Sequence, residues 1–179
     1  MFPLILKTKD HRNLIVREGE RKDAGLLLQY IERVSGETDF LSFGPGEFEM
    51  SLSEEADYLE RCLAAPNCIY LLAFVDQTLA GALNFSSRNR SRLIHVGEFG
   101  ITVQKSFWGL GVGTVLMDAL IEWARQSKII KKINLKVRTD NHPAINLYIQ
   151  KGFTVEGVMK MENYVNGVYT DILQMGLIL

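Results

Sequence analysis

Three glycines at alternate positions, Gly109, Gly111 and Gly113, follow a strand-like segment that ends at Val103 and precede a segment with helical spacing of apolar residues. Glycine lets a main chain approach a ligand closely, and the first turn of a helix presents free N–H groups and the positive end of its dipole. Such a turn can bind an anion, for example a phosphate group. A glycine-rich turn without any ligand has the same pattern, so the loop alone leaves both interpretations open.

The spacing of these glycines distinguishes the loop from two common nucleotide loops. A dinucleotide-binding turn requires G-x-G-x-x-G and a P-loop requires G-x-x-x-x-G-K-[ST], whereas residues 109–113 read G-x-G-x-G without a lysine. The run resembles the acyl-coenzyme A loop of the GCN5-related N-acetyltransferases, Q/R-x-x-G-x-G/A. Its six places fall on residues 108–113, where Trp108 replaces the usual glutamine or arginine. That replacement occurs near the ribosomal-protein and polyamine acetyltransferase branch of the family.

A second motif, DNHPAINLYIQKGF at residues 140–153, is similar to the family signature N-x-x-A-x-x-L-Y-x-x-x-G-F. The matching residues are Asn141, Ala144, Leu147, Tyr148, Gly152 and Phe153. Two motifs in the expected order imply an acetyl-CoA-dependent N-acetyltransferase. Its acceptor would be a primary amine of a small molecule or peptide, which attacks directly in a ternary complex. A non-catalytic acyl-CoA sensor or interaction domain is the alternative.

The resemblance also implies the residues that bind acetyl-CoA. In the family, the strand before the loop diverges from its parallel neighbour, so its main-chain N–H groups face the pantetheine arm and the acetyl carbonyl. The implied contacts are Ile101, Thr102, Val103, Trp108, Gly109, Leu110, Gly111, Val112, Gly113, Thr114, Asn141, Asn146 and Tyr148. Gly97 and Gly100 in the same strand fit a bulge or a close ligand approach. No metal is implied.

Aminolysis of a thioester needs a neutral amine, a stabilised carbonyl oxygen and a protonated leaving thiolate. Tyr148 is the candidate acid, because a phenol can give its proton to a thiolate as it forms. Glu98, on the same strand face as Gly100 and Thr102, is the candidate base, although a solvated strand carboxylate has the same pattern. His95 has the opposite parity and His142 lies at a helix start, so both are weaker candidates.

Acceptor specificity should lie outside the two motifs. Residues 35–50 form a loop that carries Glu37, Asp39, Glu47 and Glu49, and the hairpin near residues 164–169 contains two tyrosines. In this architecture both segments usually border the acceptor. Carboxylates with aromatic rings would suit a cationic amine such as a polyamine, an aminoglycoside or a peptide N-terminus. A charged loop that is merely solvated remains the alternative.

The remaining pattern predicts a mixed α/β fold of the acetyltransferase type. Its order is β-α-α-β-β-β-α-β-α-β-β, with a mostly antiparallel sheet of about six to seven strands and about four helices. Ser51-x-x-Glu54 predicts a capping box, and Asn166-Gly167 predicts a two-residue hairpin turn. The strand at 133–137 should run parallel to the one that ends at Val103, because a helix connects them.

The whole-chain properties fit one domain, residues 1–179. A net charge of −1 and a pI of about 6.3 disfavour a nucleic-acid or anionic-membrane partner. No signal peptide or membrane span is apparent, which favours a cytoplasmic protein. Cys62 and Cys68 lack metal-type spacing and are interpreted as reduced thiols. The apolar C-terminal strand ILQMGLIL, if it is a sheet edge, favours a homodimer.

Overall fold

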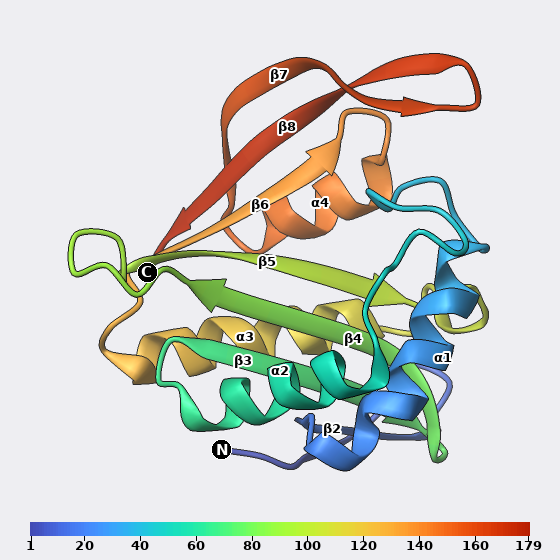
Figure 1. Ribbon diagram of the computed structural model, residues 1–179, viewed down its shortest axis with the longest axis vertical. Coiled ribbons are helices and arrows are strands. Elements are labelled where there is room, and N and C mark those ends of the chain that lie inside the picture. The colour runs from blue at the N-terminus through green and yellow to red at the C-terminus, as the bar shows by residue number, and fades with distance from the viewer.

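The computed structural model describes residues 1–179 as one eight-stranded sheet with helices on both faces (Figure 1). The strands are β1 (Leu4–Lys7), β2 (Asn13–Glu18), β3 (Cys68–Val75), β4 (Thr78–Ser87), β5 (Val96–Val103), β6 (Lys132–Arg138), β7 (Thr154–Val165) and β8 (Val168–Ile178). The helices are α1 (Ala24–Ser35), α2 (Leu52–Ala64), α3 (Val112–Ser127) and α4 (His142–Gln150), and the short 3-10 turns η1 (Arg21–Asp23) and η2 (Lys105–Phe107) precede α1 and α3. The sheet order is β1-β2-β3-β4-β5-β6-β8-β7. The predicted fold class is confirmed, with one strand more than expected because residues 4–7 pair with β2.

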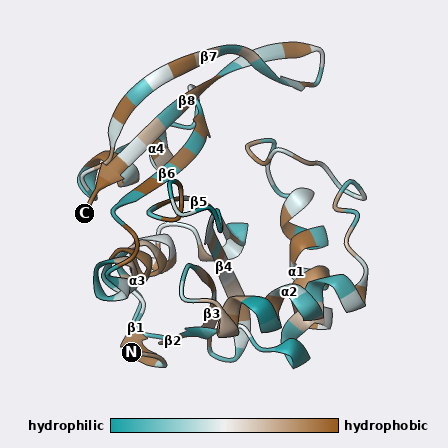
Figure 2. Cartoon of the chain, turned by 60° about the vertical axis from the view of Figure 1, so that its left-hand side comes forward, coloured by the Kyte–Doolittle hydropathy of each residue, from teal (hydrophilic) through white to brown (hydrophobic).

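The helices divide between the two faces of the sheet, as Figure 2 shows, with α1 and α2 on one side and α3 and α4 on the other. Each face has its own apolar cluster. The larger one joins α3 to the sheet around Leu116, Leu120 and Phe85. The smaller one lies under α1 and α2 around Leu27 and Leu59. Even-numbered and odd-numbered residues of a central strand therefore contact different helices.

Several predicted local signals are confirmed. The Ser51 hydroxyl accepts the Glu54 N–H at 3.3 Å, and the Glu54 carboxylate accepts the Ser51 N–H at 2.9 Å, which completes the capping box. The Asn166-Gly167 turn has positive φ at both residues, 52° and 83°, as a type I′ hairpin requires. These signals depend only on neighbouring residues, which is why the sequence contains them.

The parallel pair formed by β5 and β6 determines where a ligand can enter the sheet. β5 pairs with β6 only over Val96–Glu98, opposite Lys132–Asn134. β5 continues to Val103 and β6 to Arg138, so the two strands separate after Glu98 and Asn134. The expected divergence of these strands is present.

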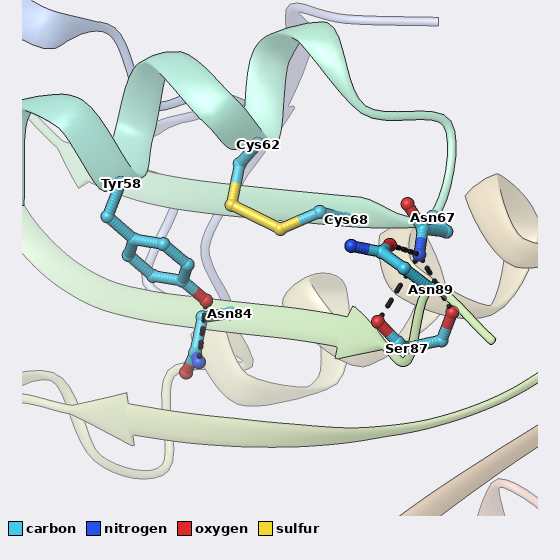
Figure 3. Close-up of a disulfide and its surroundings, with 7 residues drawn as sticks. All are labelled: Tyr58, Cys62, Asn67, Cys68, Asn84, Ser87 and Asn89. Atoms are coloured by element: carbon cyan, nitrogen blue, oxygen red, sulfur yellow. Dashed lines mark hydrogen bonds between the residues drawn. A yellow bond between two sulfur atoms is a disulfide. The ribbon is translucent and has the colours of Figure 1, made fainter. Parts of the chain in front are cut away.

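Two expectations are wrong. Cys62 and Cys68 are joined by a disulfide, with Cα atoms 4.8 Å apart, which links the end of α2 to the start of β3 (Figure 3). The sequence does not indicate this pairing, because the two cysteines approach each other only when α2 packs on β3. The strand ILQMGLIL is not a sheet edge, because β8 lies between β6 and β7. Met175 and Leu177 in it are buried, and the two edge strands are β1 and β7.

Candidate active site

The strand β5 presents main-chain groups to the opening beside β6. The Gln104 N–H donates to the Ala80 carbonyl at 2.9 Å, and β4 and β5 are paired antiparallel in continuous register. Because hydrogen bonding in such a ladder alternates along the strand, the main-chain groups of Thr102 face β4. Those of Ile101 and Val103 face the opening. The expected contact from the Thr102 N–H therefore does not fit this ladder, and the Thr102 hydroxyl instead lies 3.1 Å from the Tyr30 hydroxyl.

The glycine loop meets the conditions for an anion site. Gly109 and Gly111 have φ of 75° and 91°, and Gly111 is the N-cap residue just before α3. The N–H groups of Val112, Gly113 and Thr114 lie in the first helical turn, where no intrahelical partner exists. That turn carries no acidic residue. The positive end of a sixteen-residue helix is therefore left free of protein carboxylates.

Trp108 occupies the place where the family pattern has glutamine or arginine. Its indole N–H donates to the Val103 carbonyl at 2.6 Å, and about half of its side chain remains exposed. This bond holds the loop against the end of β5. Trp108, in place of the usual glutamine or arginine, thus fixes the loop through its side chain and does not use the main-chain N–H groups of the first turn of α3. Leu110 is half-buried, and its carbonyl accepts the Lys9 N–H at 3.1 Å.

Tyr148 lies on α4 behind β5, on the side of the sheet that carries α3. Its ring packs against Phe99 of β5 and Phe153, with centroid distances of 5.9 and 6.0 Å. The side chain is buried, and its hydroxyl makes no hydrogen bond within the chain. Burial raises the pKa of the Tyr148 phenol to about 12, so the group stays protonated at neutral pH. Tyr148 is thus a buried, protonated phenol that packs on Phe99, the first residue of β5 beyond its pairing with β6.

The two asparagines assigned to the cofactor differ in their surroundings. Asn141 caps α4, because its side-chain oxygen accepts the Ala144 N–H at 3.4 Å. Asn146 is exposed on α4 and has no hydrogen-bond partner. The structure therefore gives Asn141 a role in positioning the helix of Tyr148, and Asn146 remains a prediction.

Glu98 stands where the pairing of β5 with β6 ends. Its side chain is exposed and forms no hydrogen bond or ion pair within the chain. It lies on the α1 and α2 face with Gly100 and Thr102, as alternation predicted. His95 precedes β5 and His142 opens α4, and both are exposed.

Gly97 and Gly100 allow close packing and form no bulge, since the register with β4 is continuous. A Cβ atom on Gly97 would lie 2.3 Å from the Phe85 ring, and one on Gly100 would lie 2.9 Å from the Asn84 side-chain oxygen. Gly100 thus brings Asn84 directly over β5, on the face that carries Glu98. The bulge interpretation is wrong, because the pairing of β4 with β5 has no register shift at either glycine. The glycines instead leave room for side chains of β4.

The carboxylates of the loop between α1 and α2 mostly hold that loop in place. Glu37 accepts the Lys105 N–H at 2.6 Å, Glu47 accepts the Gly44 N–H at 2.6 Å, and Asp39 accepts the Asn166 side-chain amide at 3.1 Å. Glu49 alone among the four is exposed without a partner. The Asp39 bond joins the loop to the tip of the β7–β8 hairpin. Tyr164 and Tyr169 pair across that hairpin with centroids 4.7 Å apart.

Two features escaped the sequence reasoning. Lys9, in the turn between β1 and β2, has no acidic partner, and its Cγ lies 3.9 Å from where a Cβ of Gly111 would be. It brings a free cation to the glycine loop. The side-chain oxygens of Gln104 and Asn134 are buried without hydrogen-bond partners, one just after β5 and the other at the last pair that β6 forms with β5. No sequence signal identifies Lys9, because about 100 residues separate it from the loop.

The model of the acetyltransferase (GNAT) family matches residues 37–153, which contain the loop, the diverging strands and Tyr148. The chain belongs to this family, whose members are acyltransferases that use acetyl-CoA. No three His, Cys, Asp or Glu side chains lie together in a way that could hold a metal ion. None of the helices combines the length and the apolar character that a membrane span requires.

Particular relatives agree with this membership. The L-amino acid N-acetyltransferase AaaT of Escherichia coli K12 is 35% identical over 116 residues, which are 65% of this chain and 72% of that protein. The crystal structure of a GNAT-family acetyltransferase from Streptococcus pneumoniae superposes with a TM-score of 0.90 at 35% identity, covering 93% of this chain and 99% of the other. The yncA acetyltransferase of Salmonella typhimurium, solved with acetyl-CoA, has a TM-score of 0.80 at 18% identity over 93% and 94% of the two chains. The last comparison supports the fold alone.

Proposed function

We propose that this protein transfers the acetyl group of acetyl-CoA directly to a primary amine of a small molecule or peptide. The observation that carries the proposal is the opening between β5 and β6, with the glycine loop at one end of β5 and the buried Tyr148 phenol behind it. The helix end can bind the phosphates of the cofactor, and the free strand amides and the phenol can stabilise the carbonyl oxygen and protonate the thiolate that thioester aminolysis produces.

The pantetheine arm fits the opening by its hydrogen-bonding character. Its amides are both donors and acceptors, and the opening offers the N–H groups of Ile101 and Val103 as donors. Gln104 and Asn134, whose side-chain oxygens have no partner, stand at the two ends of the opening, just after β5 and at its last pair with β6. The pyrophosphate then lies at the first turn of α3, with Lys9 near it. Because N–H groups of a strand are fixed in direction, the Ile101 or Val103 N–H can hold the carbonyl oxygen as it gains negative charge.

The acceptor should approach from the α1 and α2 face. The other face of β5 is occupied at this point, because Gly113 of α3 packs near Val103 and Tyr148 packs on Phe99. Glu98, Gly100 and Thr102 point away from these helices. An amine that arrives from their side meets the thioester carbonyl opposite the Tyr148 phenol. Nucleophile and proton donor are thereby placed on opposite sides of the sheet.

The chemistry follows from this placement. The neutral amine nitrogen attacks the carbonyl carbon, a C–N bond forms, and the C–S bond breaks with its electron pair on sulfur. Tyr148 donates its proton to that sulfur and later regains one from water. The proton that the amine loses passes to Glu98, directly or through water. Glu98 needs only modest basicity, since a neutral fraction of an alkylamine exists at neutral pH.

The test is release of free coenzyme A thiol from acetyl-CoA in the presence of L-amino acids, polyamines, aminoglycosides and short peptides. L-Amino acids belong in the panel because the relative AaaT is named for them. Thiol release that requires one class of amine, with the acetylated amine detected by mass spectrometry, supports the proposal. Binding of acetyl-CoA without release by any amine would favour a non-catalytic acyl-CoA sensor.

For assembly we propose a homodimer through β7, the edge strand at the C-terminal end of the sheet. Val155, Val158 and Met161 of β7 are each about half exposed or more, and an exposed apolar edge tends to be covered. Light scattering during gel filtration should give twice the chain mass, and Val158→Lys should give the single-chain mass. A wild-type chain that elutes as a monomer at high concentration would contradict the dimer. A cytoplasmic location remains a prediction.

A further inference from the structure

Glu55 is the most unusual titratable group of the chain outside the acetyl-transfer site. It lies in the first turn of α2, and its side chain is 1% exposed. Both carboxylate oxygens are buried without a hydrogen-bond partner, and no lysine, arginine or histidine forms an ion pair with it. Burying a carboxylate without a partner costs free energy. A group that remains in such a place requires an explanation.

The residues around Glu55 are aromatic rings that carry hydroxyl groups. Its charge acts on Tyr70 of β3, which is itself buried. The Tyr70 ring meets the Tyr58 ring edge-on, with centroids 5.8 Å apart, and Tyr30 lies in the same apolar cluster. A carboxylate among aromatic rings is a suitable environment for an ammonium group, since ring faces and carboxylate both attract a cation.

This cluster is connected to the acetyl-transfer site through β4. Asn84 is the partner of Gly100 on β5 and of Tyr70 on β3, so these three residues lie side by side on the α1 and α2 face. The Asn84 side-chain amide donates a long hydrogen bond of 3.5 Å to the Tyr58 hydroxyl, as Figure 3 shows. Two strand spacings separate β5 from β3, which is about 10 Å. Tyr70 of β3, on which the Glu55 charge acts, is thus about the length of a short diamine from Gly100 of β5.

We infer that Glu55 selects acceptors that carry a second cationic group, and that this group pairs with its carboxylate while the first amine attacks at β5. The inference rests on the proposed acetyl transfer and names the acceptor class for that same site. The loop carboxylates Glu37, Asp39 and Glu47 are already bonded within the chain, which leaves Glu55 as the buried acid without a partner. Tyr58 is half-buried, and the second cationic group reaches Glu55 beside its ring.

The free protein supports this assignment. Burial raises the pKa of the Glu55 carboxyl, because no cation compensates for the loss of water. A cation that enters beside Tyr58 supplies that compensation and favours the ionised carboxylate. Binding of the second cationic group therefore releases a proton from any Glu55 that was protonated.

The experiment compares cadaverine, which has two ammonium groups, with pentylamine, which has one and the same carbon chain. Thiol release and calorimetric titration are measured for the wild type and for Glu55→Gln, an isosteric change that keeps the volume. Glu122→Gln is the matched control, because Glu122 is exposed on α3, on the opposite face of the sheet from α2. The wild type and Glu122→Gln should prefer cadaverine. In Glu55→Gln the KM for cadaverine should rise about tenfold or more, the effect of losing a charge-assisted bond, with kcat and the pentylamine KM unchanged.

A second measurement separates this role from a structural one. Glu55→Gln should unfold at a higher temperature than the wild type at neutral pH, because it removes a buried charge without a partner. Lower thermal stability of Glu55→Gln, or an intact preference for cadaverine, would overturn the inference. The titration is also made without acetyl-CoA, so it tests Glu55 even if no thiol is released. In that case cadaverine binding that Glu55→Gln abolishes would support the cation site while the proposed acetyl transfer fails.

Discussion

Replacement of Tyr148 by phenylalanine removes the proposed proton donor and leaves its surroundings in place. The ring contacts with Phe99 and Phe153 do not involve the hydroxyl, and the hydroxyl makes no hydrogen bond that the change would break. We expect the free energy of unfolding at neutral pH to stay within about 1 kcal/mol of the wild type. Loss of a general acid should lower kcat by about 10²–10⁴, with the acetyl-CoA KM unchanged.

The same variant has a signature at high pH. The pKa of Tyr148 is raised from 10.0 to about 12 in the folded chain, so between these values the folded protein holds a proton that the unfolded chain has lost. Stability due to this group is therefore complete below pH 10 and declines as the pH rises towards 12. The decline amounts to about 3 kcal/mol at 1.4 kcal/mol per pH unit. In Tyr148→Phe the loss of stability at high pH should be smaller than in the wild type by this amount.

The assay is thiol release with saturating acceptor from pH 7 to 10, together with urea unfolding from pH 9 to 11. Tyr164→Phe is the control, since Tyr164 is 60% exposed and lies in the hairpin. An unchanged kcat in Tyr148→Phe would refute the acid role. A wild-type rate that falls as a phenol titrates near pH 10 would refute the protected state of Tyr148.

Three further substitutions test the loop, the strand and the helix start. Lys9→Ala should weaken acetyl-CoA binding several-fold, more at low salt than at high salt, and calorimetry with an unchanged dissociation constant would exclude a phosphate contact. Gly97→Ala places a Cβ 2.3 Å from the Phe85 ring and should lower the free energy of unfolding by about 1–3 kcal/mol, whereas a chain as stable as wild type in urea would show that β4 can shift. Ser51→Ala removes the cap of α2 and should cost about 1 kcal/mol in the same urea experiment; no loss would mean that Glu54 alone sustains the helix start.

Much of the fold could be predicted because its signals are local. The glycine loop, the Ser51 capping box and the Asn166-Gly167 turn each depend on residues within a few positions of one another. The long connection from β5 through α3 to β6 implied the parallel pair. The disulfide could not be predicted, because Cys62 and Cys68 approach only when α2 lies against β3.

The parts of the site that belong to sequence motifs, the glycine loop and Tyr148, could be predicted. The main-chain direction at Thr102 depends on the register with β4, which no single-strand pattern reveals. The acidic composition of the loop between α1 and α2 suggested an acceptor site. The hydrogen bonds of Glu37 and Asp39 within the chain could not be predicted, because they depend on where that loop lies. Glu55 did leave a signal, since it stands four and seven residues before Leu59 and Cys62 on the buried face of α2. An acid on the apolar face of a helix should be considered as a candidate site residue.

The placement of acetyl-CoA in the opening beside β5 is the central claim, and amide NMR of the uniformly labelled protein titrated with coenzyme A tests it most directly. We predict that the amide resonances of Ile101 and Val103, and those of Val112 to Thr114 in the first turn of α3, shift most. The Thr102 amide, bonded to β4, should shift less. Saturable shifts confined to other elements, or no shifts at all, would contradict the account.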